Sequence, residues 1–142
     1  MRRTRAAGHT VTELIVVLMI VGVLLAVAVP RVQRVLDRIT VHGAATDVAQ
    51  ALGSARALAI AGHASVAVDL DSLSGVLRVR RGTELLLSRN IGSLHDVTLT
   101  RSRDSLTYDG RGLGRGAANL SIVVHRRTAA ETVFVSRFGR VR

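Results

Sequence analysis

The sequence contains no cysteine, no tryptophan and no lysine, and it has a single proline among 142 residues. Without cysteine the chain can form no disulfide, no thiolate metal site and no cysteine nucleophile. Aromatic side chains are also scarce, because Tyr108, Phe134 and Phe138 are the only three. Any core must therefore be built from Val, Leu, Ile and Ala, which bury less area per side chain than aromatic residues do.

Negative charge is scarce as well: 20 basic residues stand against 10 acidic ones, a formal net charge of +10. All the basic residues are arginine, and residues 101–142 alone carry nine arginines and three acidic residues. An arginine-only bias is typical of a GC-rich genome, but guanidinium groups also match the geometry of phosphate. The arginines can therefore form either a solvated surface or an anion-binding surface, and the composition does not distinguish the two.

One long apolar run lies near the N-terminus. Leu14–Val29 is free of charge over 16 positions, and extension back to Val11 gives 19 positions that include Glu13. A membrane-spanning helix needs about 20 mostly apolar residues. Three arginines among the first five residues would hold the N-terminus in the cytoplasm. We expect residues 9–29 to form one transmembrane helix, with the rest of the chain outside the cytoplasm.

An ordinary secretory signal peptide is an alternative, since Ala26-Val27-Ala28 fits a small-residue cleavage site. Three features argue against it. Glu13 is a charge at the mouth of the apolar run, which is costly near a membrane. Gly8 lies immediately between the charged leader and the apolar segment, and the helical pattern continues beyond Pro30. A buried carboxylate needs a partner, and cleavage after Gly8 would create a free amino group that could supply one.

Gly8, a five-residue segment ending in Glu13, and an apolar run that contains Gly22 and closes at Pro30 resemble the signal of type IV prepilins and type II secretion pseudoprepilins. The resemblance implies a leader of residues 1–8 and cleavage after Gly8 by a prepilin peptidase. It also implies N-methylation of His9, which stands where the family usually has Phe. Glu13 is then expected to act in filament assembly by pairing with the amino group of a neighbouring subunit.

Residues 30–62 are expected to form an amphipathic helix that continues the apolar segment and is capped by Gly62. Its apolar residues Val32, Val35, Leu36 and Ile39 follow i, i+3, i+4, i+7 spacing. A stripe of small residues continues the pattern and consists of Ala44, Ala45, Val48, Leu52, Ala55 and Ala59. Arg31, Arg34 and Arg38 are expected on the other face, together with Asp37.

After Gly62 the apolar period changes to two. Alternation at 66–70, 77–80, 97–100 and 106–108 predicts short strands, and 120–125 with 132–136 predicts a hairpin across Arg126–Glu131. Residues 63–142 are therefore predicted to form an antiparallel β-rich head domain. The predicted fold class is α+β and pilin-like: a long N-terminal helix, transmembrane in its first half, packed on the sheet of the head.

The C-terminal part resembles the end of the GspH/FimT pseudopilin domain through Tyr108, Gly112, Gly139 and Arg140. This resemblance implies a minor pseudopilin, a structural subunit of a type II secretion pseudopilus and not an enzyme. Its implied partners are other pseudopilins or pilins, the prepilin peptidase and the inner-membrane assembly platform. The implied location is the bacterial inner membrane, crossed once, with the N-terminus cytoplasmic and the head periplasmic.

Two other functions stay open. One is a FimT-like type IV minor pilin that binds DNA during natural transformation through Arg137, Arg140 and Arg142. Such contacts would be to phosphates and therefore sensitive to salt. Only Phe138 is interleaved with these arginines, so base stacking is not expected to be the main mode. The other is a secreted β domain released by an ordinary signal peptidase.

No catalytic, cofactor or metal site is expected. The five histidines do not have metal-ligand spacing, and no Gly-x-Ser-x-Gly nucleophile motif is present. The segment 110–116 has glycine at every second position. It is expected to be a flexible surface loop, or an arginine-bearing loop for an anionic partner.

Overall fold

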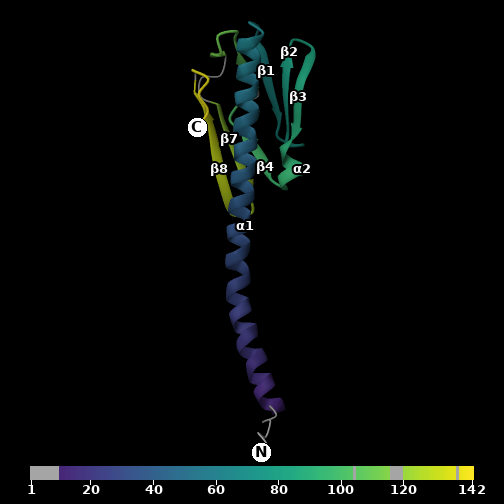
Figure 1. Cartoon of the computed structure of the whole chain (residues 1–142), viewed down its shortest axis with the longest axis vertical. Coiled ribbons are helices and arrows are strands. Elements are labelled where there is room, and N and C mark those ends of the chain that lie inside the picture. The colour runs from purple at the N-terminus through teal and green to yellow at the C-terminus, as the bar shows by residue number, and fades with distance from the viewer. Residues whose placement is uncertain (1–9, 104, 116–119, 137) are drawn as a thin grey trace, which may run out of the picture. The chain divides into compact units, whose positions relative to one another are not determined.

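The computed structural model describes residues 10–103, 105–115, 120–136 and 138–142. These residues form two compact units, one ending at Val35 and the other beginning at Leu36. Figure 1 shows the elements in order along the chain. They are α1 (Val11–Ala61), β1 (Val66–Asp71), β2 (Val76–Arg81), β3 (Glu84–Asn90), α2 (Ile91–His95), β4 (Thr98–Arg101), β5 (Ser105–Tyr108), β6 (Gly114–Arg115), β7 (Leu120–Arg126) and β8 (Ala129–Val135).

The first unit is the N-terminal part of α1. Its described residues are exposed to solvent in the isolated chain, including the large apolar side chains from Val11 to Val35. The most apolar window of α1 has a mean hydropathy of 2.8 and no buried residue, so by length and composition this helix could cross a membrane. A helix that is apolar all round needs an apolar environment on every side.

Helix α1 ends in a Schellman motif, in which His63 takes the left-handed conformation with φ 44°. The Ala64 N–H donates to the Ala59 carbonyl at 3.2 Å and the His63 N–H donates to the Ile60 carbonyl at 3.2 Å. The expectation that Gly62 would be the capping glycine is therefore wrong. Gly62 is the residue before this left-handed position, and its own φ is not positive.

The second unit, the head, contains two antiparallel sheets. The larger has the strand order β3-β2-β1-β5-β6 and the smaller has the order β4-β7-β8. The head half of α1 packs on the inner faces of both sheets through small residues, among them Ala44, Ala51 and Ala55, which are fully buried or nearly so. Small side chains let the helix backbone approach the sheets closely, which suits a core without phenylalanine. The expected α+β class, a long N-terminal helix packed on an antiparallel β head, is confirmed.

The two parts of the predicted helix stripe differ in burial. The small-residue part is buried in the head and consists of Ala44, Ala45, Val48, Leu52, Ala55 and Ala59. The first part is exposed: Val32, Val35, Leu36 and Ile39 have 56%, 54%, 56% and 63% of their surface accessible. Asp37, expected on the face opposite the stripe, is only 4% exposed and faces the head. Helical spacing gives the stripe, but it cannot tell a face that packs on the chain's own head from one left for another partner.

Three other details differ from the sequence-based expectation. The β7–β8 hairpin does not have a loop across 126–131, because Arg126 pairs with Ala129 and the turn contains only two residues. Strand β3 was not predicted: its apolar residues run consecutively over 85–87 and do not alternate. The short elements α2 and β6 were also missed, since five and two residues are too few to show a period.

Candidate functional site

The predicted cleavage and methylation residues, Gly8 and His9, lie outside the described part of the chain. Glu13 lies in the first turn of α1. Its carboxylate accepts hydrogen bonds from the Thr10 N–H at 2.8 Å and the Thr10 hydroxyl at 3.1 Å, and the Glu13 N–H donates to the Thr10 hydroxyl at 3.3 Å. This reciprocal arrangement is a capping box that starts the helix. The Thr-x-x-Glu spacing could have revealed it in the sequence.

The capping box gives Glu13 a second role beside the predicted one. In the single chain its carboxylate completes the N-terminal hydrogen bonding of α1, where a negative charge also suits the helix dipole. An assembly partner that offers a cation must therefore compete with, or share, the Thr10 contacts. Removing the charge and removing the cap are separable changes, because glutamine can fill the same capping position.

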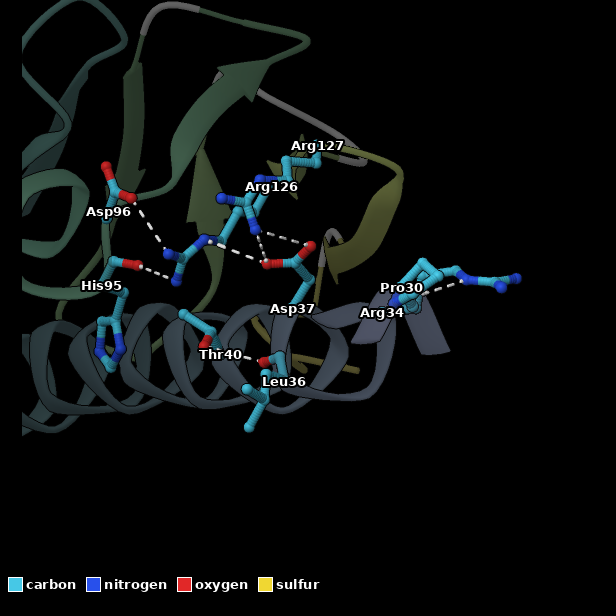
Figure 2. A network of polar contacts seen from close by, with 9 residues as sticks. All are labelled: Pro30, Arg34, Leu36, Asp37, Thr40, His95, Asp96, Arg126 and Arg127. Atoms are coloured by element: carbon cyan, nitrogen blue, oxygen red, sulfur yellow. Dashed lines mark hydrogen bonds and ion pairs between the residues drawn. The ribbon is translucent and has the colours of Figure 1, made fainter. Parts of the chain in front are cut away.

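A buried ion-pair network surrounds Asp37 (Figure 2). The Asp37 Oδ1 lies 3.3 Å from Arg126 Nε and 3.2 Å from Arg127 Nη1. Arg127 stands in the two-residue β7–β8 turn with φ 50°, an uncommon conformation for a residue other than glycine. A carboxylate as buried as Asp37 is tolerated only with charged partners, so this contact fixes the hairpin turn against α1.

Arg126 extends the same network to α2. Its Nη2 lies 3.1 Å from Asp96 Oδ2, and its Nη1 donates to the His95 carbonyl at 3.4 Å. The His95 side chain in turn contacts α1, with its Nε2 2.7 Å from Asp47 Oδ2. The helix is thus tied to β7, the hairpin turn and α2 by charged groups at the end of the head where α1 enters it.

The C-terminal arginines stand on a closed hairpin. The Phe134 N–H donates to the Arg142 carbonyl at 2.8 Å, and the Arg142 N–H returns a bond to Phe134 at 2.9 Å. The Ser136 N–H donates to the Arg140 carbonyl at 2.9 Å. Arg140 and Arg142 are exposed while Val141 between them is half-buried. Both arginines therefore lie on the outer face of this strand, and Arg137 lies outside the described residues.

Arg56 of α1 binds the glycine-rich loop beside this hairpin. Its Nε donates to the Gly112 carbonyl at 2.9 Å. Gly139 has φ 72°, and a Cβ there would lie 2.4 Å from the Gly112 carbonyl oxygen and 3.0 Å from Arg56 Nε. Gly112 has φ 76° and would place a Cβ 2.7 Å from Ile60. Two of the residues that carry the family resemblance are thus glycines because no side chain fits around Arg56.

The exposed surface beside the hairpin combines aromatic and basic side chains. We define the C-terminal patch as Phe134, Phe138, Arg140 and Arg142. Phe134 is 55% exposed and Phe138 is 68% exposed, and the patch borders a shallow groove of about 450 Å3. In the sequence only Phe138 is interleaved with the arginines, but the backbone pairing of Phe134 with Arg142 adds a second aromatic ring to the same surface. Such a surface can bind an anionic partner and also offer apolar contact.

The glycine-rich loop is organised around Asp109. The Asp109 carboxylate accepts the N–H groups of Arg111 at 2.9 Å and Leu113 at 3.0 Å, and it lies 3.6 Å from Arg115 Nε. The hydrogen bond from the Leu113 backbone is the main cause that lowers the pKa of Asp109 below its ordinary value. This carboxylate is engaged within its own loop. Among the described residues no group of three or more His, Cys, Asp or Glu side chains could hold a metal ion.

The comparison with solved structures identifies the architecture. The chain resembles two crystal structures of the type IV minor pilin FimU of Pseudomonas aeruginosa, both at 14% identity. The first has a TM-score of 0.63 over 74% of this chain and 88% of FimU, and the second has 0.60 over 71% and 90%. The fold is that of a pilin. No family model matches the sequence, and no curated protein sequence matches it significantly.

Proposed function

We propose that the protein is a minor pseudopilin, a structural and non-catalytic subunit of a type II secretion pseudopilus in the bacterial inner membrane. The observation that carries the proposal is a pilin fold in which the apolar segment of the N-terminal helix is not buried by any other described residue of the chain. Before assembly, lipid would surround this helix. After assembly, the helices of other pseudopilins or pilins would replace the lipid.

The exposed stripe on α1 supports this proposal. Leu36 and Ile39 belong to the head, yet they stay open to solvent while small residues on the other face of the helix are buried. Apolar side chains in contact with water are unfavourable by about 25 cal/mol per Å2. A filament in which this face contacts neighbouring helices removes that cost. At the N-terminal end of α1, the Glu13 carboxylate would pair with the amino group of His9 on a neighbouring subunit, after the prepilin peptidase has cut the leader.

Deletion and complementation distinguish secretion from the alternatives. A strain that lacks the gene should lose type II secretion and regain it with the wild-type gene, while twitching and transformation stay normal. Loss of pili or of transformation with normal secretion would overturn the secretion proposal and leave a type IV pilus subunit. Release of a soluble, helix-free head into the medium would overturn both, and would favour the secreted β domain.

Cross-linking tests assembly directly, because the chain has no cysteine of its own. A single Ile39→Cys on the exposed stripe should form disulfides with cysteines placed in neighbouring pseudopilins at the assembly platform. Leu85→Cys, on the exposed β3 edge strand of the head, is a matched control of similar exposure. Cross-links from both positions with equal yield would show random collision and not an assembled interface.

A DNA-binding type IV minor pilin is the second candidate. The C-terminal patch favours it, because the hairpin presents two arginines and two aromatic rings on one exposed surface. Arginine would neutralise phosphates and phenyl rings could stack with unpaired bases.

A further inference from the structure

The glycine-rich loop is closed by hydrogen bonds and lies against the end of α1. The Asp109 N–H donates to the Leu113 carbonyl at 2.9 Å, and the Gly112 N–H donates to the Asp109 carbonyl at 2.8 Å. A Cβ on Gly110 would lie 2.8 Å from the His63 carbonyl carbon, so the loop backbone touches the chain just after the helix. Together with the side-chain contacts of Asp109, these bonds fix the backbone on which the arginines of the loop stand.

A polar groove lies between this loop and the segment that follows α1. It has a volume of about 450 Å3 and is lined by His63, Ser65, Asp109, Gly110, Arg111 and Arg115. The Asp109 side chain is only 14% exposed and already lies 3.6 Å from Arg115, whereas the Arg115 side chain is 74% exposed. Arg111 is exposed as well. Among the described residues that line the groove, the carboxylate is therefore mostly buried, while the two guanidinium groups can bind a further anion.

Strand pairing brings a third arginine to the same face of the larger sheet. Arg80 of β2 is paired with Ala67 of β1, and Ala67 is paired with Thr107 of β5. Thr107 is paired in turn with Arg115 of β6. Residues directly opposite each other on neighbouring strands point to the same side of a sheet. This side faces away from α1, because the alternate residues of β1 are the buried ones. Neighbouring strands are about 4.8 Å apart, so Arg80 and Arg115 stand roughly 14 Å apart, with small side chains between them.

The charge of Arg80 is less compensated within the sheet than that of the neighbouring Arg78. Arg78 stands directly opposite Asp69 of β1. Arg80 stands between Ala67 on one side and Leu85 on the other, and Asp69 is only diagonal to it. Directly opposite residues on paired strands are closer together than diagonal ones, so Asp69 favours Arg78. We define the basic rim as the three arginines of the groove and of this row, Arg80, Arg111 and Arg115.

Charge and shape favour an acidic polypeptide as the partner of the basic rim. A second copy of the chain is disfavoured, because each copy carries a net charge of +10 and the two repel each other. Nucleic acid with unpaired bases would use aromatic rings for stacking, and no aromatic side chain is among the described residues that line the groove. The roughly 14 Å between the outer arginines accommodates one extended chain or one helix of about 10–12 Å diameter. Carboxylates along such a segment can bind guanidinium groups in the bidentate geometry.

We propose that the head binds an acidic polypeptide segment of another protein across Ala67 and Thr107, with carboxylates of the segment on the basic rim. The small side chains between the arginines let the segment approach the sheet, and the arginines on either side hold it by charge. The basic rim shares no residue with the exposed stripe of α1 or with the C-terminal patch. It would therefore recruit a partner other than the helices of a filament, in a secretion pseudopilus and in a type IV pilus alike.

An acidic peptide is the probe that tests the basic rim. A fluorescein-labelled chain of ten glutamates would be titrated with the full protein in uncharged detergent at low salt, with anisotropy as the measure of binding. Arg80→Ala with Arg115→Ala should weaken binding of the peptide about tenfold, since it removes two surface ion pairs. Arg140→Ala with Arg142→Ala is the matched control, because it removes two charges from the C-terminal patch and should leave the affinity nearly unchanged. Arg111→Ala, a single change outside the strands, should weaken binding about threefold, and it still reports on the rim if the double variant unfolds.

The other outcomes overturn the inference. Equal losses from the two double variants would show that binding follows net charge alone, and a wild-type protein that does not bind the peptide saturably would show that the rim does not recognise carboxylates. DNA of ten nucleotides, single-stranded and duplex, is the competing anion. If the change at Arg80 and Arg115 weakens binding of DNA as much as binding of the peptide, the rim binds polyanions in general and not an acidic polypeptide. Urea unfolding of each variant separates loss of the rim from loss of the fold.

Discussion

At the scale of single residues, Tyr108 and Arg81 each have a buried polar atom without a hydrogen-bond partner among the described residues, and Tyr108 is the one whose pKa is shifted. It is fully buried, its hydroxyl has no hydrogen-bond partner among the described residues, and burial raises its pKa to about 12 against a weaker opposing effect of Arg56. As the only tyrosine in a chain without tryptophan, it can be followed without interference. Its absorbance and its contribution to stability are therefore both measurable.

Stability should fall as the pH rises from about 10 to about 12. The unfolded tyrosine ionises near pH 10 and the folded one only near 12, so the folded state binds more protons between these values. The contribution is fully present below pH 10 and is lost as the pH passes the folded pKa, roughly 2–3 kcal/mol in all. Absorbance at 295 nm and urea unfolding at each pH measure it.

Tyr108→Phe should abolish this pH dependence and raise the free energy of unfolding by about 1 kcal/mol, because it removes an unpaired buried hydroxyl. An unchanged pH dependence in that variant would refute the assignment.

The two roles of Glu13 can be separated by Glu13→Gln. Glutamine keeps the capping position with Thr10 but removes the charge, whereas Glu13→Leu removes both. If charge pairing between subunits is essential, both variants should insert in the membrane and both should fail in cross-linking to neighbours. Thr10→Ala is the control, since it weakens the cap and leaves the charge. Normal cross-linking of Glu13→Gln would show that capping and not pairing is what assembly needs.

At the scale of elements, the Asp37 network joins α1 to the β7–β8 turn. Asp37→Ala should lower the free energy of unfolding by about 1–3 kcal/mol, because hydrogen bonds to charged groups are lost while the more exposed Arg127 can be hydrated. Urea denaturation of the full chain in detergent measures the change. Arg38→Ala, one position away and exposed, should stay within about 0.5 kcal/mol. Equal changes in the free energy of unfolding for the two substitutions would show that the Asp37 network does not stabilise the fold.

The C-terminal hairpin carries the test of DNA binding. If the patch binds DNA, Arg140→Ala with Arg142→Ala should weaken binding uniformly across sequences and lower the slope of log affinity against log salt by about 1.8. Phe134→Ala with Phe138→Ala should weaken single-stranded DNA more than duplex, since only unpaired bases can stack. Fluorescence anisotropy of the full chain in detergent, at several salt concentrations, measures both.

A matched control variant removes the same number of positive charges, two, from another part of the head. Arg78→Ala with Arg80→Ala removes two arginines from β2 of the larger sheet, away from the hairpin. This variant should leave the affinity for DNA nearly unchanged if the patch is the site. Equal losses from the two double variants would mean that binding follows net charge alone, and would remove the DNA-uptake candidate.

Elements with a clear period could be predicted, and elements without one could not. Helix α1 and strands β1, β2 and β7 follow their apolar spacing. Strand β3 has three consecutive leucines, and it exists because β2 pairs with it across a two-residue turn. The left-handed residues His63 and Arg127 stand where sequence reasoning would place a glycine or a loop. Their conformations are fixed by the Schellman bonds and by Asp37, which are contacts made after folding.

At the scale of the whole molecule, the first proposed step of maturation is the proteolytic removal of residues 1–8. Intact-mass and N-terminal analysis of protein extracted from membranes should find His9 as the first residue. A bulky substitution, Gly8→Leu, should leave the leader attached and prevent assembly, because the peptidase acts at the glycine. Gly22→Ala is the control inside the helix, where a Cβ has open space. An N-terminus at Val29 would instead prove cleavage by an ordinary signal peptidase.

The sequence by itself determined the apolar run, the small-residue stripe of the helix, the change of period from helix to strand after residue 62 and the α+β class. These follow from local spacing and composition, which need no partner in space. Only the tertiary structure decided that Asp37 faces the head while Leu36 and Ile39 stay exposed, and that Phe134 joins Arg140 and Arg142. Such facts depend on which segments meet after the chain folds, and helical spacing has no information on what lies opposite each face.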